Sequence, residues 1–78
     1  NHLKNHDLAL SDFSKALQLN PKGYFIYKFR GDVLKILEEY EKSAEDYITY
    51  LKSKGEKLEE DITEVRNSLK EMGFSPEN

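Results

Sequence analysis

The chain repeats itself at an offset of 34 residues, and this repetition constrains its fold more than any other feature. Three pairs of positions at that offset hold the same residue, and two further pairs match in size or aromatic character. The identical pairs are Leu3 and Leu37, Asp12 and Asp46, and Leu17 and Leu51, and the similar pairs are Ala9 and Ser43, and Phe13 and Tyr47. Units of this length hold two helices that bury their apolar faces against neighbouring units. We therefore expect stacked helical pairs.

Apolar residues recur at the three- and four-residue spacing of helices, and the alternation typical of strands is absent. Polar or glycine-containing stretches interrupt this pattern at "NPKG", after Leu37 at "EEYEK", around Gly55, and at the closing "GFSP". These stop signals predict four helices at roughly 6–19, 22–37, 40–53 and 56–72, joined by short links that favour antiparallel hairpins. We expect Gly73 to take the left-handed conformation that ends a helix.

The stretch "ALSDFSKALQLNP" resembles the second-helix signature of the tetratricopeptide repeat, which alternates small and aromatic positions and closes on a proline. The residues that carry this resemblance, together with those at repeat-packing positions in the next unit, are Ala9, Phe13, Ala16, Pro21, Tyr27, Gly31, Leu34, Tyr40 and Tyr47. A glycine such as Gly31 lets two helices approach closely. The resemblance implies that Tyr27, Gly31 and Leu34 pack on the other helix of the same hairpin.

The resemblance also implies an all-α fold, with about four helices in antiparallel hairpins that form a fragment of a right-handed solenoid. Residues 1–21 then hold the second helix of a half repeat, 22–55 a full repeat, 56–73 a capping helix, and 74–78 a tail. A generic helical bundle with accidental repeat spacing is the alternative architecture. The sequence begins without Met, and we expect a fragment from the C-terminal end of a longer cytoplasmic protein.

Departures from the family pattern mark where the array of repeats is expected to end. Arg30 replaces the usual leucine, and Tyr50, at a small-residue position, is expected to push away a standard neighbouring repeat. The last predicted helix has one apolar stripe, formed by Leu58, Ile62, Val65, Leu69 and Met72. Its other face is charged, which is typical of a capping helix. Phe74 is expected to fold back on the last turn.

The predicted helix at 22–37 is apolar on almost every side. By resemblance, one of its surfaces lines the concave groove in which peptides lie, and this candidate binding surface consists of Phe25, Lys28, Phe29, Asp32, Lys35 and Ile36. Two interpretations of Phe25, Phe29 and Ile36 remain open. They pack against the capping helix or against the first helix of the missing upstream repeat, or they form a hydrophobic groove for a partner's helix or extended peptide.

Several classes of function are not expected from this composition. The 78 residues carry 15 acidic and 12 basic side chains, so no strong positive field attracts nucleic acid. No apolar stretch approaches the roughly 20 residues that span a bilayer, so membrane insertion is not expected. Cysteine is absent, the four glycines are isolated, and nothing near Glu59 and Glu60 supplies a nucleophile. We therefore expect neither an enzyme nor a cofactor.

Two more specific sites are not expected from the sequence. His2 and His6 have a zinc-compatible spacing, but the repeat register places them on different helices with "LKN" as the turn between them. Some tetratricopeptide repeats grip the carboxylate tails of chaperones with lysine and asparagine side chains. Lys28 matches the first lysine of that clamp, but Asp32 replaces the asparagine and would repel a carboxylate.

The sequence therefore predicts a noncatalytic scaffold or adaptor that binds a protein or peptide in the concave groove. The alternative is a structural module whose exposed repeat end stacks on another copy, as a homo-oligomer, or on another subunit.

Overall fold

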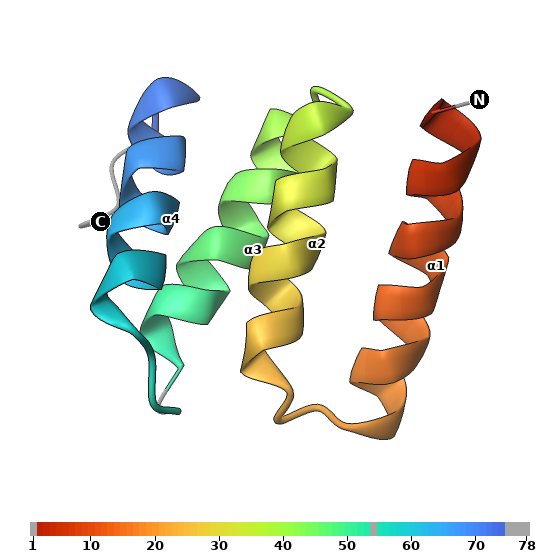
Figure 1. The fold of residues 1–78 in the computed structure, drawn as a ribbon, viewed down its shortest axis with the longest axis horizontal. Helices are drawn as coiled ribbons and strands as arrows, with labels where there is room; N and C mark the ends of the chain where they lie inside the picture. Colours follow the sequence, from red (N-terminus) through yellow and green to blue (C-terminus); the bar gives the residue numbers. More distant parts are fainter. Residues whose placement is uncertain (1, 54, 75–78) are drawn as a thin grey trace.

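The computed structural model describes residues 2–53 and 55–74, with side chains from residue 5 onward (Figure 1). These residues form four α-helices: α1 (His2–Leu19), α2 (Tyr24–Ile36), α3 (Tyr40–Lys52) and α4 (Glu59–Glu71). No strand occurs within the described ranges. The all-α class and the expectation of four helices are therefore confirmed.

The four helices lie beside one another in chain order, and each runs antiparallel to the one before it (Figure 1). The α2–α3 pair is the closest, while α1 contacts α2 and α4 contacts α3. Short links of three to six residues explain this order, because they leave consecutive helices no partner nearer than each other.

The first helix starts earlier than the sequence pattern predicts. The expected turn at "LKN" is absent, since α1 is continuous from His2 to Leu19. Leucine, lysine and asparagine are all compatible with a helix interior, and no glycine or proline occurs before Pro21 to stop it. His2 and His6 are thus one turn apart on a single helix, and their expected placement on different helices was wrong.

Two helices end in the same hydrogen-bonded motif, but with different residues in the left-handed position. After α4, Gly73 has a φ of 87°, as expected, and the N–H of Phe74 donates to the carbonyl of Leu69 at 2.8 Å. After α2, Glu38 takes this position with a φ of 64°, and the N–H of Glu39 donates to the carbonyl of Leu34 at 2.9 Å. These bonds satisfy carbonyls that a helix terminus leaves unpaired.

The hydrophobic core lies between α3 and α4 and is formed by Ala44, Tyr47, Tyr50, Val65 and Leu69. Tyr50 is buried in this cluster beside α4. Whether it would exclude a standard neighbouring repeat stays a prediction. Phe74 packs against the same cluster, as expected. Leu58 does not continue the apolar stripe of α4: it is exposed because it precedes the first helical turn and has extended backbone.

Gly31 allows the close approach of α2 and α3. A Cβ atom at this position would lie 2.8 Å from the ring of Tyr47, which is closer than packed carbon atoms come. Ser43 uses the same proximity, because its hydroxyl donates a 2.6 Å hydrogen bond to the carbonyl of Gly31. The close contact expected at Gly31 is therefore present.

The first helix is held less completely than the other three. None of its described side chains is fully buried, and the residues on its apolar face, Ala9, Leu10, Phe13, Ala16 and Leu17, are all partly exposed. This face packs mainly against α2. The contact includes the ring of Phe13 against that of Phe29 and a 3.5 Å hydrogen bond from Arg30 to Ser14.

Candidate functional site

The six residues of the predicted groove lie along one side of α2 but divide into two parts. At 100° per residue, Lys28, Asp32 and Lys35 form one edge of this side, which we call the polar strip. The other edge consists of Phe25, Phe29 and Ile36, which we call the apolar row. The strip and the row differ in their contacts with the rest of the chain.

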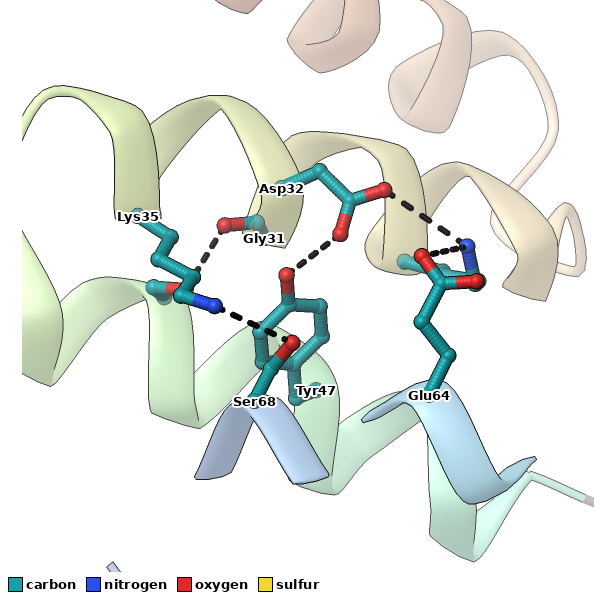
Figure 2. A network of polar contacts seen from close by, with 8 residues as sticks. Gly31, Asp32, Lys35, Tyr47, Glu64 and Ser68 are labelled. Atoms are coloured by element: carbon teal, nitrogen blue, oxygen red, sulfur yellow. Dashed lines mark hydrogen bonds and ion pairs between the residues drawn. The ribbon is translucent and has the colours of Figure 1, made fainter. Parts of the chain in front are cut away.

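The polar strip is turned toward α4, as Figure 2 shows. The ammonium of Lys28 lies 3.4 Å from the carboxylate of Glu64 and 3.5 Å from that of Asp32. Lys35 lies 3.0 Å from the carboxylate of Glu71. Lys28 is only 7% exposed. Its side chain is therefore part of the α2–α4 contact and does not project into an open groove as the sequence suggested.

The electrostatic surroundings of Lys28 are negative. Burial lowers the pKa of Lys28, but the charges of Asp32, Glu64 and Asp61, with the hydrogen bond to Glu64, together raise it above 10.5. The opposing effects show that the acidic side chains outweigh the cost of removing an ammonium from water. Lys28 therefore stays charged and ties α2 to α4.

A partly buried hydrogen bond joins the polar strip to the core. The hydroxyl of Tyr47 on α3 donates to the carboxylate of Asp32, so Asp32 contacts both Tyr47 and Lys28 (Figure 2). Burial, and secondarily the bond to Asp32, raises the pKa of Tyr47. The phenol is thus held neutral as a donor, and it fixes the rotamer of Asp32 at the centre of the predicted groove.

The apolar row is far less covered than the polar strip. Phe25, Phe29 and Ile36 are 59%, 46% and 62% exposed. The ring of Phe29 lies 6.5 Å from that of Phe13 on α1, in a stacked arrangement, and 6.0 Å edge-on from that of Phe25. The aromatic contact of the row is thus with α1, whereas the capping-helix interpretation placed it on α4. About half of each side chain in the row faces solvent.

A shallow depression adjoins the polar strip on its α4 side. Its lining consists of Lys35, Glu59, Glu60, Thr63, Glu64, Asn67, Ser68 and Glu71. Four carboxylates face one ammonium there, and that ammonium is already paired with Glu71. The depression therefore has an excess of negative charge. The apolar row, the polar strip and the depression therefore lie side by side, in this order, from α2 to α4.

The residues predicted at repeat-packing positions differ in burial. Gly31, Leu34 and Tyr47 are buried at the α2–α3 contact, while Tyr27 is partly buried against the core. The α1 residues Ala9, Phe13 and Ala16 are partly buried, and Pro21 and Tyr40 are exposed. Pro21 lies in the turn after α1, and Tyr40 begins α3. Their role in stacking repeats stays a prediction.

Sequence reasoning missed the most complete ion pair. The guanidinium of Arg30 donates two hydrogen bonds, of 2.7 and 2.8 Å, to the two carboxylate oxygens of Asp46 on α3. The hydrogen bond to Asp46 raises the pKa of Arg30. With its weaker bond to Ser14, Arg30 links three helices. The sequence held one signal for this ion pair: Arg30 stands where the tetratricopeptide pattern usually has leucine. A half-buried cation at such a position requires a carboxylate partner.

Comparisons with protein-family models, with curated proteins and with solved structures found no match to this chain. Within the described ranges, no helix combines the length and apolar character needed to cross a membrane.

Proposed function

We propose that this chain is a noncatalytic protein-interaction module of tetratricopeptide-like helical hairpins, and that a peptide or helix of a partner binds along the apolar row of α2. One observation carries the proposal: Phe25, Phe29 and, two turns further on, Ile36 lie on one side of the same helix and remain about half exposed. Large apolar side chains in contiguous positions on a surface are typical of binding sites.

The apolar row can supply part of the binding free energy. Covering the exposed parts of two phenylalanines and one isoleucine would contribute about 3 kcal/mol before the cost of association. That amount supports only weak binding. A specific partner therefore needs further contacts beside the row, and the polar strip and depression lie where these contacts would form.

Contacts with α3 and α4 fix the position of α2, the helix that carries the apolar row. Tyr47 packs on Gly31, Arg30 binds Asp46 on α3, and Lys28 binds Glu64 on α4. A platform that is already ordered loses little conformational entropy when a partner binds. This support favours a binding role for the exposed side of α2.

The test uses two substitutions that avoid the α1 contact. Phe25→Glu and Ile36→Glu, combined in one variant, place charges in the row without removing the stack between Phe29 and Phe13. Randomised peptides displayed on phage are selected against the unmodified chain, and the enriched peptides are then measured by calorimetry. We expect the double variant to weaken their binding at least about tenfold.

The matched control is Leu8→Glu combined with Leu19→Glu, which also introduces two negative charges, at side chains that are 58% and 88% exposed on α1. It should leave peptide binding unchanged. Equal loss in the control, or full binding by the Phe25→Glu, Ile36→Glu variant, would contradict a site on the apolar row.

A second candidate function is stacking on another copy through α1. The observation that favours it is that no described apolar side chain of that helix is fully buried. Leu8 and Leu19 are 58% and 88% exposed. A second copy packed there would complete the burial. Sedimentation tests this directly: a monomer at tens of micromolar contradicts stacking between copies, and a Phe13→Glu variant should abolish any dimer.

A further inference from the structure

We propose that the partner segment is basic as well as apolar, with apolar side chains on the apolar row and lysine or arginine side chains over the acidic depression of α4. This inference rests on the proposed function and adds the chemistry of the partner.

The row and the depression belong to one surface. Starting from Phe29, the exposed side of α2 passes through Asp32 to Lys35, and Lys35 itself lines the depression. Glu64 and Glu71 of α4 continue the surface from there (Figure 2 shows Glu64 beside the polar strip). An extended or helical segment lying across α2 and α4 would therefore touch apolar side chains at one edge and carboxylates at the other.

The charges on this surface are unbalanced. Lys28 and Lys35 are both paired with carboxylates of the chain itself. Glu59 and Glu60 line the depression and form no ion pair with any residue in the described ranges. Arg66 and Lys70 of α4 are not among its lining residues. The depression therefore keeps free carboxylates that attract cations.

Charge complementarity indicates which kind of segment fits the surface formed by α2 and α4. An acidic segment would meet like charges at Glu59, Glu60 and Glu64, which lowers the association rate and the affinity. A second copy that presented the same face would repel itself for the same reason. A neutral apolar segment would leave the carboxylates unpaired but hydrated. Only a basic segment gains from both parts of the surface.

The experiment uses the peptides selected on the unmodified chain. We expect the enriched sequences to combine apolar residues with a net positive charge, and their binding to weaken as salt rises. Glu60→Lys should lower their affinity about fivefold to tenfold, because it replaces an attraction by a repulsion at the rim.

The matched control is Glu41→Lys. Glu41 is the second residue of α3, as Glu60 is the second residue of α4, so both variants disturb an exposed first-turn carboxylate equally. Binding by Glu41→Lys should equal that of the unmodified chain, and both variants should lose the same small amount of helix stability.

The outcomes distinguish the two proposals. Peptides that lose binding in the Phe25→Glu, Ile36→Glu variant, but are neutral or acidic, overturn the basic-partner inference and leave the proposed function standing. Equal effects of Glu60→Lys and Glu41→Lys also overturn the inference alone. Peptides that bind independently of the apolar row overturn both.

Discussion

The two sides of α2 are built from similar residues but serve the fold differently. On the side toward α3, Gly31 and Leu34 are buried. On the opposite side, Phe25, Phe29 and Ile36 are equally apolar and stay about half exposed. The first side forms the buried contact between α2 and α3. The second is covered only in part, chiefly where Phe29 stacks on Phe13 of α1, and large exposed apolar side chains are the property expected of a surface that a partner covers.

The largest expected difference between the two sides is in stability. Leu34→Ala should lower the free energy of unfolding by about 2–5 kcal/mol, because it leaves a cavity at a buried position. Ile36→Ala, two positions along the same helix, should change it by less than about 0.5 kcal/mol. Urea unfolding followed by circular dichroism measures both. Equal losses would mean that the two sides contribute alike to the fold.

A smaller effect is expected where α2 and α3 approach most closely. Gly31→Ala adds a Cβ atom 2.8 Å from the ring of Tyr47 and should cost about 1–3 kcal/mol despite the better helix propensity of alanine. The same urea titration measures this change. A more stable Gly31→Ala variant would show that the helices separate easily and that the close contact is not required.

The third prediction concerns alkaline pH. The folded chain raises the pKa of Tyr47 above its ordinary 10. The pKa values of Tyr50 and Lys28 are raised as well. The unfolded chain therefore loses these protons first, so the stability they contribute is full below pH 10 and falls as pH rises above it. Each group contributes up to about 1.4 kcal/mol per pH unit.

Tyr47→Phe isolates the contribution of the buried phenol. The variant should be less stable than the unmodified chain at pH 8, because Asp32 loses a donor. Its stability should then decline less steeply between pH 10 and pH 11 in thermal unfolding followed by circular dichroism. Parallel declines of the two chains would contradict a neutral, hydrogen-bonded Tyr47 in the folded state.

The sequence was sufficient to predict the helices and some of the contacts between them. Apolar spacing and stop signals gave the number and approximate ends of the helices, and glycine at position 31 indicated a close approach. The start of α1 was missed because no residue between Leu3 and Asn5 forces or forbids a helix. Only the structure shows that α1 runs through this stretch.

Contacts between side chains of different helices could not be predicted from the sequence. Lys28 and Arg30 are two residues apart, yet Lys28 pairs with α4 and Arg30 with α3. Their partners depend on how the helices are rotated and spaced, which local spacing does not determine. For the same reason, the sequence did not predict the contact of Phe29 with Phe13 of α1. It placed Phe13 at a repeat-packing position and Phe29 in the candidate binding surface.

The central claim is that the apolar row of α2 is available to a partner because the fold does not require it. The most direct measurement is the free energy of unfolding of the Phe25→Glu, Ile36→Glu variant relative to the unmodified chain. We predict a change of less than about 0.5 kcal/mol with helicity retained. A loss of more than about 2 kcal/mol would contradict the claim, because it would show that the row stabilises the fold.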